Sequence, residues 1–123
     1  ILAFRLNGTE TPLPPKQMKF NTPEPPQKEI KPELVDRGAV IYYNYCETCH
    51  GGFGKNHYSQ HPDLSKMPPG THDLFNKIVL EGLLSSAGMA NFSNSLDAEE
   101  TEALQHYLIK QQQVQYEVEQ SAK

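Results

Sequence analysis

Long apolar runs and clusters of basic residues are both missing from this sequence of 123 residues. A membrane-spanning helix needs about 18 or more consecutive apolar residues, and no run here comes near that length, so we expect no membrane span. Lysine and arginine form no stripe that would follow a phosphate backbone, and the formal net charge is -4, so we expect no nucleic-acid partner. The length predicts one domain with extensions.

The N-terminus lacks an initiator methionine and a basic-then-apolar leader, since the chain begins at Ile1. We interpret the chain as a mature form or an excised piece of a longer protein, with any targeting signal outside it. Residues Ile1–Leu6 have an alternating apolar pattern before the turn signal Asn7-Gly8, which predicts a strand. A single strand is unstable in isolation, so its partners would belong to another part of a larger protein or to another chain. A disordered, tag-like end is the alternative.

Only two cysteines occur, and they lie in one C-E-T-C-H segment. A C-x-x-C-H segment is the attachment site of a c-type haem: Cys46 and Cys49 each bond one vinyl group of the porphyrin, and His50 presents its imidazole to the iron. A thioredoxin-like dithiol would leave the histidine unexplained. A zinc site would need two further ligands, for which His57 and His61 are candidates, and a structural disulfide is the third alternative. We predict one covalently bound haem c.

Proline usage divides the rest of the chain. Seven of the ten prolines fall between Asn7 and Pro32, in a polar segment with few apolar residues, which predicts a linker. Such a linker either spans the distance to another domain or lies along a neighbouring surface, with Phe20 and Ile30 as anchors. After Lys110 the apolar stripe fails, so an exposed helical extension or a frayed end is expected there. The predicted parts are a strand and linker (1–32), the folded domain (33–110) and a polar extension (111–123).

Three helices are predicted in the folded domain. Apolar residues recur at helical spacing from Glu33 and lead directly into His50, after which a glycine-rich loop begins. A second helix is expected to start with Thr71 as its N-cap and to end near Gly82. Asp97, followed three residues later by a glutamate, forms a capping-box pattern that predicts the start of the third helix. The domain is therefore expected to be all-α, with three main helices around the haem.

The second axial position of the iron decides the function, because an open position binds small molecules whereas a second strong ligand leaves electron transfer. Met89 lies in the loop between the second and third helices, so a complete helix separates it from His50 and can bring it to the opposite haem face. We predict Met89 as the second ligand, with Met67 and His72 as alternatives. His106 is expected to face solvent, on the side of the third helix away from its apolar stripe. The remaining candidates are Met18, His57 and His61.

Several motifs follow one another in a fixed order: Gly38 and Tyr42, Cys46-x-x-Cys49-His50, Pro62-Asp63-Leu64, Gly88-Met89, and a terminal helix with Leu104 and Tyr107. In this order the motifs resemble those of class I cytochromes c. The resemblance implies that the glycine and the tyrosine of the first helix pack against Tyr107. It also implies that Pro62 accepts a hydrogen bond from the ring of His50. The residues expected to bind the haem are Cys46, Cys49, His50, Pro62, Leu64, Met89 and Phe92, with His50 and Met89 as iron ligands.

Further strings, Ile78-Val79-Leu80-x-Gly82 and Gly88-Met89-Ala90-x-Phe92, are similar to the C-terminal cytochrome domain of quinohaemoprotein alcohol dehydrogenases. So are the string Leu2-Ala3-Phe4-Arg5-Leu6-x-Gly8 and the proline-rich linker after it. The resemblance implies a parent dehydrogenase domain that holds pyrroloquinoline quinone (PQQ) and calcium and donates electrons to the haem. It further implies a downstream cytochrome, copper protein or oxidase as acceptor, and a periplasmic location after export.

Three functions follow from these patterns. The chain is expected to be a one-electron transfer domain tethered to a PQQ-dependent dehydrogenase, and not an enzyme by itself. An independent periplasmic cytochrome c carrier is the first alternative, for which the N-terminal strand would be an accidental tail. A haem sensor or enzyme with an open sixth position is the second, and it requires that Met89 does not bind the iron.

Overall fold

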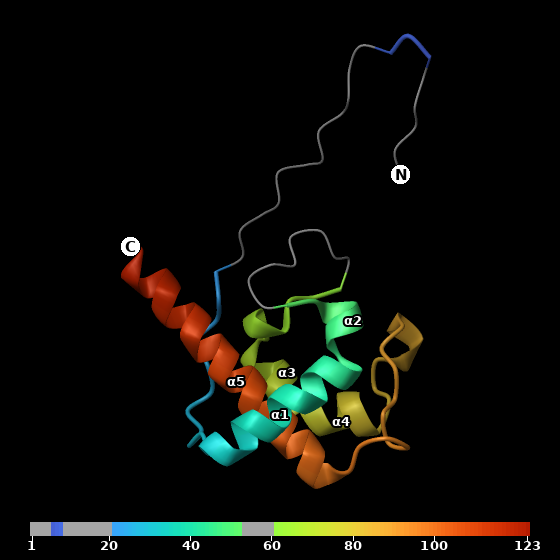
Figure 1. The fold of residues 1–123 in the computed structure, drawn as a ribbon, viewed down its shortest axis with the longest axis vertical. Helices are drawn as coiled ribbons and strands as arrows, with labels where there is room; N and C mark the ends of the chain where they lie inside the picture. The colour runs from blue at the N-terminus through green and yellow to red at the C-terminus, as the bar shows by residue number, and fades with distance from the viewer. Residues whose placement is uncertain (1–5, 9–20, 53–60) are drawn as a thin grey trace.

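The computed structural model describes residues 6–8, 21–52 and 61–123, and within these ranges the regular structure is entirely helical. The helices, with η marking 3-10 turns, are α1 (Pro32–Tyr45), α2 (Glu47–His50), η1 (Leu64–Lys66), α3 (Pro69–Asp73), α4 (Phe75–Leu80), η2 (Ser85–Ala87) and α5 (Ala98–Ser121). Figure 1 shows α1, α3 and α4 gathered around the long helix α5. The all-α prediction is confirmed. None of the described helices has the length and apolar character that crossing a membrane would require.

Most of the predicted N-terminal strand, residues 1–5, lies outside the described residues, as does Phe20. Leu6 and Asn7 lie in a turn, and Asn7 has a left-handed backbone with a φ of 65°. Asparagine tolerates this conformation better than most residues, which agrees with the turn signal at Asn7-Gly8.

The first predicted helix consists of two helices, α1 and α2. Pro32 lies in the first turn of α1, where its missing N–H costs no hydrogen bond. The helix ends at Tyr45, and Cys46 forms a turn with φ -116° and ψ -36° before α2 begins. The prediction of one helix running to His50 is therefore wrong at Cys46, because an apolar period indicates a common face but not a continuous axis. Figure 1 shows α2 set at an angle to α1.

The second predicted helix is also two short helices. Pro68 is the N-cap of α3 and Pro69 lies in its first turn, so Thr71 is inside the helix and is not the N-cap. Proline is suited to a first helical turn, and two consecutive prolines therefore start the helix before Thr71. Leu74, with φ -95° and ψ 6°, separates α3 from α4. The buried residues of α4 are Phe75, Ile78 and Val79.

The third predicted helix, α5, begins with the expected capping box. The Asp97 side chain accepts a hydrogen bond from the Glu100 N–H at 2.8 Å, and the Asp97 N–H donates to the Glu100 carboxylate at 3.0 Å. The helix continues to Ser121, well beyond Lys110. Within the expected exposed extension, Val118 is 59% exposed, but Gln112 is completely buried.

The crossing of α1 and α5 forms the centre of the core. A Cβ atom at Gly38 would lie 2.1 Å from the carbonyl oxygen of Ala103, so only glycine permits this approach of the two helices. The rings of Tyr42 and Tyr107 pack with centroids 5.6 Å apart. Gly38 and Tyr42 thus pack against Tyr107 as the resemblance implies. Leu104 and Leu108, 1% and 0% exposed, belong to the same apolar cluster.

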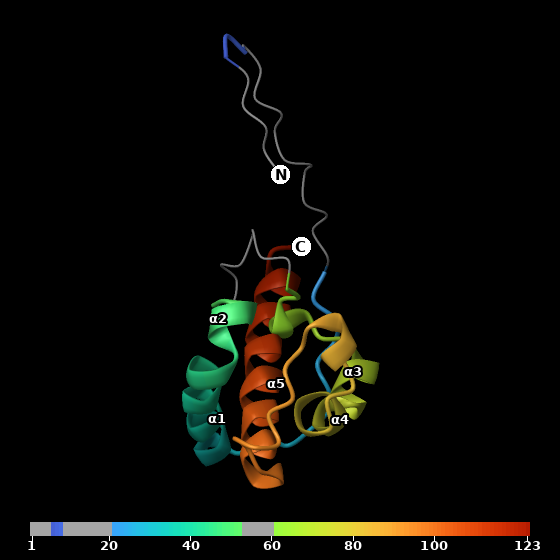
Figure 2. The ribbon, with the colours of Figure 1, turned by 90° about the vertical axis from the view of Figure 1, so that its right-hand side faces the viewer.

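A segment that we call the strap, residues 21–31, lies along α5. Figures 1 and 2 both show it beside this helix. Together with α1, α4 and η1, the strap covers α5 on several sides. His106 is therefore only 1% exposed, and its Nδ1 accepts a hydrogen bond from the Lys31 N–H at 3.4 Å. The prediction that His106 faces solvent is wrong, because the apolar stripe of one helix does not reveal polar coverage from elsewhere.

Candidate haem-attachment site

The C-E-T-C-H segment is placed at the junction of α1 and α2. Cys46 occupies the turn between the helices and is buried, whereas Cys49, on α2, is exposed, and the two are not joined by a disulfide. Burial, with a smaller effect of Cys49, raises the pKa of the Cys46 thiol to about 11. The buried sulfur is thus held as a neutral thiol.

His50, at the end of α2, is held in a defined orientation. Its Nδ1 lies 2.8 Å from the carbonyl oxygen of Pro62, and an imidazole nitrogen that bonds a carbonyl carries the proton. The lone pair is then on Nε2, which is the atom suited to bind iron. The hydrogen bond that the resemblance implies between Pro62 and His50 is present. The ring of His61 lies nearby, with its centroid 6.1 Å from that of His50.

The turn after the motif is also tied to the core. The Tyr42 hydroxyl donates a hydrogen bond to the Gly51 carbonyl, which follows His50 directly. Gly51 has a φ of 71°, a left-handed conformation that favours glycine and ends α2. Burial is the main cause that raises the pKa of Tyr42, so this hydroxyl remains a proton donor at neutral pH. Tyr42 belongs to the α1–α5 crossing, so its hydrogen bond to Gly51 ties the end of α2 to that crossing.

Met89 lies in the loop between α4 and α5 and is partly buried. Gly88, with a φ of 96°, ends η2, and the Met89 N–H then donates to the Leu84 carbonyl at 3.1 Å. Phe92 connects this loop to the motif, because its ring packs edge-on against Tyr45 with centroids 5.9 Å apart, one residue before Cys46. Figures 1 and 2 show the η2 loop at the same height as α2. The loop that carries Met89 is thus joined to the start of the haem motif.

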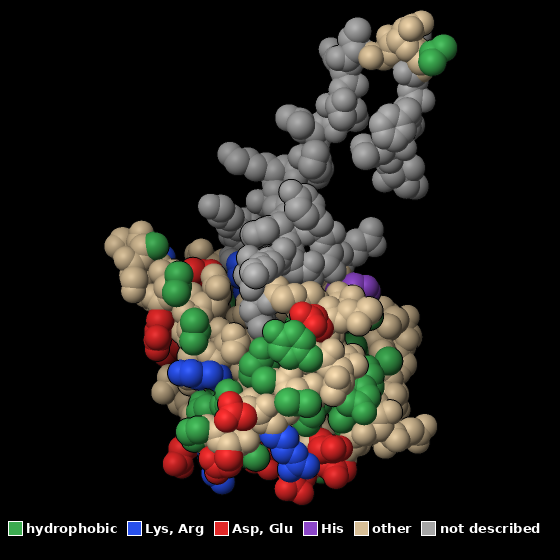
Figure 3. Space-filling view, viewed as in Figure 1, with side chains coloured by type: hydrophobic (Ala, Val, Ile, Leu, Met, Phe, Trp, Pro, Cys, Tyr) green, Lys and Arg blue, Asp and Glu red, His purple; other side chains and the backbone are tan. Residues whose placement is uncertain are grey.

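Apolar side chains remain accessible on the segments that lead to and follow this motif. Leu83 and Leu84 of the Met89 loop are 49% and 41% exposed, and Leu64, like Phe92, is only partly buried. Figure 3 shows further apolar side chains over α1, where Val40 and Tyr43 are each 61% exposed. Two thiols, an oriented imidazole, a thioether loop and accessible leucines fit the chemistry of a covalently attached porphyrin.

The other candidate ligands have different surroundings. Met67 is 4% exposed in the apolar core, and His72 has its Nε2 2.8 Å from Oε1 of the buried Gln112. Met18 and His57 lie outside the described residues. Among the residues that are described, no three of histidine, cysteine, aspartate and glutamate are grouped as metal ligands. Met89 remains the predicted second ligand.

Sequence reasoning missed the buried polar residues around α5. Gln112 donates hydrogen bonds to the carbonyls of Pro23 (3.0 Å) and Met67 (3.1 Å) while it contacts His72. A glutamine in a Gln-rich run carries no signal that separates it from its exposed neighbours. Its position four residues after Leu108, on the apolar stripe, was the one available signal.

The oriented histidine, the two thiols and the surrounding helical fold define a cytochrome c domain. The chain belongs to the family described as "Cytochrome C oxidase, cbb3-type, subunit III", which matches residues 33–108. Membership of this family implies a covalently bound haem c and electron transfer.

More specific relatives contain this domain as one part. The chain is 35% identical over 124 residues to the dehydrogenase subunit of the quinone alcohol dehydrogenase of Acetobacter aceti, covering 100% of this chain and 16% of the relative. It is 32% identical to quinohemoprotein alcohol dehydrogenase ADH IIB of Pseudomonas putida, over 94% of this chain and 17% of that protein. The chain therefore spans about a sixth of the length of these curated relatives.

Solved structures agree with these relatives. Quinohemoprotein alcohol dehydrogenase ADHIIG from Pseudomonas putida HK5 matches with a TM-score of 0.68 and 28% identity, over 85% of this chain and 15% of the other. The enzyme from Comamonas testosteroni has a TM-score of 0.64 at 23% identity, over 80% of this chain and 15% of the other, which shows the shared fold. The chain is thus a cytochrome c domain that matches the C-terminal part of quinohemoprotein alcohol dehydrogenases.

Proposed function

We propose that this chain is the electron-accepting haem domain of a PQQ-dependent dehydrogenase and passes single electrons to a downstream cytochrome, copper protein or oxidase. The observation that carries the proposal is the match of the whole chain, including residues before α1, to quinone-dependent alcohol dehydrogenase subunits. An independent carrier would give no reason for similarity in those residues. PQQ and calcium belong to the proposed dehydrogenase domain and not to this chain.

The residues of this chain have separate tasks in the proposed function. When bound, haem c supplies a one-electron redox couple. Cys46 and Cys49 would hold it covalently, and the Pro62 carbonyl keeps the imidazole of His50 in its binding orientation. Met89 would supply a soft thioether to the iron, and Leu64 and Phe92 would help to exclude water. A methionine ligand would raise the reduction potential and would leave no open position for a substrate.

The test of the proposed function uses the full-length gene product. Adding an alcohol, aldehyde or sugar substrate should reduce the haem, followed by its visible absorption, at a rate that does not depend on protein concentration. The rate is independent because donor and acceptor share one polypeptide. A rate that rises with protein concentration, or a gene without a dehydrogenase domain, would favour the independent carrier.

The ligation by Met89 is tested by a pair of methionine variants. Met89→Ala should abolish the weak near-infrared absorption of sulfur-to-iron ligation and lower the reduction potential. Met67→Ala is the matched control, since Met67 is a core residue: it should keep the absorption and lose about 2–5 kcal/mol of stability. Loss of the absorption in Met67→Ala in place of Met89→Ala would show that the ligand assignment is wrong.

Attachment and location form the last part of the proposal. The haem should stay with the polypeptide through acid-acetone extraction and denaturing electrophoresis, because the thioether bonds proposed at Cys46 and Cys49 survive both treatments. We also propose a periplasmic location after export, which the resemblance to quinohaemoprotein alcohol dehydrogenases implies. Recovery of the haem protein in the cytoplasmic fraction of its host would contradict this location.

A further inference from the structure

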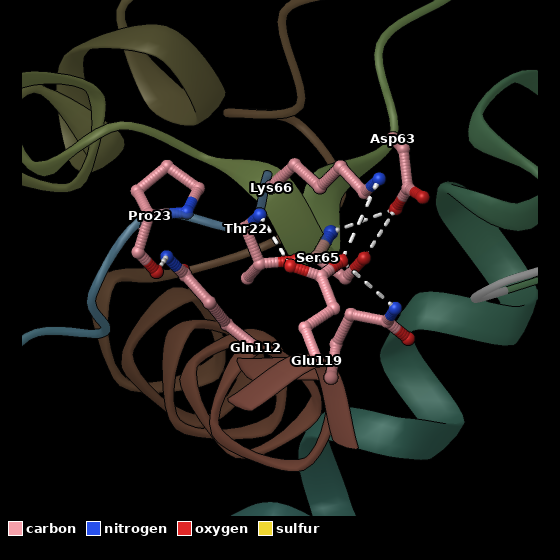
Figure 4. Close-up of polar contacts among 8 residues, drawn as sticks. Thr22, Pro23, Asp63, Ser65, Lys66, Gln112 and Glu119 are labelled. Carbon is pink, nitrogen blue, oxygen red and sulfur yellow. Dashed lines mark hydrogen bonds and ion pairs between the residues drawn. The ribbon is translucent and has the colours of Figure 1, made fainter. Parts of the chain in front are cut away.

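The N-terminal end of the strap is attached to the C-terminal end of α5 through one carboxylate. Glu119 accepts two hydrogen bonds from Thr22, from the backbone N–H at 2.7 Å and from the hydroxyl at 2.8 Å. Figure 4 shows both contacts on the same side of α5. Thr22 is 4% exposed, although the residues on either side of it are more accessible. A bidentate contact of this kind fixes both the position and the direction of the chain at Thr22.

The surroundings of Glu119 hold its carboxylate in place. Gln115, one turn earlier on α5, donates to it at 3.2 Å, and the ammonium group of Lys66 lies 3.9 Å away. Lys66 projects from η1, whose start is capped by the hydrogen bonds of the Asp63 carboxylate with Ser65 (Figure 4). Burial would raise the pKa of Glu119, but the bonds from Thr22 and Gln115 and the charge of Lys66 outweigh it and lower the pKa. The group is therefore an anion at neutral pH.

Two further contacts continue along α5 toward its N-terminus. The side chain of Gln112 donates to the Pro23 carbonyl at 3.0 Å, and Nδ1 of His106 accepts from the Lys31 N–H at 3.4 Å. The strap thus runs antiparallel to α5, from Glu119 past Gln112 to His106. Its sequence separation from these partners, 97 residues at Glu119 and 75 at His106, makes it a tertiary element.

We infer that Glu119 is a positioning residue that clips the strap to the haem domain, so that only the chain before Thr22 serves as the tether to a preceding dehydrogenase domain. This inference rests on the proposed function for its consequence, electron transfer within one polypeptide. The clip itself is a property of the described residues.

The clip changes the reach of the tether. A fully extended linker from Asn7 to Pro32 would span about 80 Å at about 3.1 Å per residue, whereas Asn7 to Asn21 alone would span at most about 45 Å. The tether also leaves the domain at a defined place, beside the C-terminal end of α5 and η1. A shorter tether raises the effective concentration of the donor near the haem, because this concentration falls roughly as the -3/2 power of tether length.

The clip is tested first in the full 123-residue holoprotein by amide hydrogen exchange. Glu119→Ala should raise the exchange rate of the Thr22 N–H about tenfold or more, because it removes the acceptor of that N–H. Glu117→Ala is the matched control, with the same change of charge on an exposed residue of the same helix, and should leave Thr22 protected. An unchanged Thr22 exchange rate in Glu119→Ala would overturn the clip.

The consequence is tested in the full-length gene product by stopped-flow reduction of the haem. Gln112 still holds Pro23 in Glu119→Ala, so the strap is released by the double variant Glu119→Ala/Gln112→Leu. Release lengthens the tether from about 15 to about 26 residues, so this double variant should slow the substrate-driven reduction about twofold, with the haem spectrum and potential unchanged. Glu117→Ala should reduce at the original rate. An unchanged or faster rate in the double variant, with Thr22 exchanging rapidly, would overturn the assignment of the tether. Absence of intramolecular reduction in the unaltered protein would overturn the proposed function, while protection of Thr22 would still support the clip.

Discussion

Two of the interfaces that hold α5, those with α1 and with the strap, differ in chemistry. The crossing with α1 is apolar and close, with Gly38 against the Ala103 backbone and the Tyr42 and Tyr107 rings in contact. The interface with the strap is built from hydrogen bonds, among them the contact of Gln112 with Pro23. An apolar contact accepts many residues of suitable volume, whereas a buried polar group needs its own partner. The first interface therefore depends on shape, and the second depends on particular pairs of atoms.

The largest expected effect is at the apolar crossing. Alanine normally stabilises a helix by up to about 1 kcal/mol relative to glycine, but Gly38→Ala should destabilise the domain by about 3 kcal/mol or more, because its Cβ would overlap the Ala103 carbonyl. Denaturant unfolding of the holoprotein measures the change. Gly70→Ala is the control, since a Cβ there meets no atom within 4 Å, and it should change stability by less than about 1 kcal/mol. Equal effects of the two substitutions would contradict the close approach.

The second largest loss of stability is expected when the strap is removed. Deleting residues 1–31 removes the hydrogen bonds of the strap with Glu119, Gln112 and His106 and should cost about 2–4 kcal/mol of stability. Deleting residues 1–20 keeps the strap and should leave the denaturation midpoint nearly unchanged. The haem spectrum should survive both deletions. If both deletions unfold at the same denaturant concentration, the strap contributes nothing to the domain.

A single buried amide should have a smaller effect. Gln112→Leu keeps the approximate volume but leaves two carbonyls and a histidine without their partner, so we expect a loss of about 2 kcal/mol. Gln111→Leu, at a partly exposed neighbouring position, should be within about 0.5 kcal/mol of the original protein. The unfolding free energies of the two variants decide the matter: equal values would mean that the hydrogen bonds of Gln112 add no stability.

The smallest expected effect is the change of stability with pH. Burial is the main cause that lowers the pKa of His72 and of His106 below 6.5; at His106 the charges of Lys28 and Lys31 act with it and Glu102 against it. Because the unfolded chain then binds these protons more readily, their contribution to stability is complete above pH 6.5 and is lost as the pH falls through the folded pKa values.

The denaturation midpoint should therefore fall between about pH 7 and about pH 5. Histidine is the side chain whose charge normally changes in this interval. His106→Gln, which removes one of the two titrating groups, should make the fall shallower. An identical pH profile for His106→Gln would show that His106 is not the source of the dependence.

Much of the apolar interface could be predicted from local patterns. The stripe that begins at Leu34 and the capping box at Asp97 have signals within a few residues, and the structure contains both of them. The packing of Gly38 and Tyr42 against Tyr107 is implied by the resemblance to class I cytochromes c, and it is also present. The predicted ends of the helices were less accurate. The break between α1 and α2 at Cys46 and the start of α3 at Pro69 depend on how the chain turns, which periodicity does not encode. Periodicity indicates which residues share a face but not where an axis bends.

The polar interface could not be predicted in the same way. The strap resembles a disordered linker in composition, with many prolines and few apolar residues. Its order comes from hydrogen bonds to α5 that join residues 75 to 97 positions apart. This separation in sequence also explains why the burial of His106 and Gln112 was not predicted, since the strap that covers them comes from the opposite end of the chain.

The sequence by itself determined the haem-attachment motif, the helical class and the family resemblance, because these depend on residue types at short, fixed spacings. Only the tertiary structure decided that Phe92 joins the Met89 loop to Tyr45 and that Glu119 holds Thr22. Hydrogen bonds and ring contacts of this kind require two groups to meet within a few ångströms, which depends on the path of the whole chain.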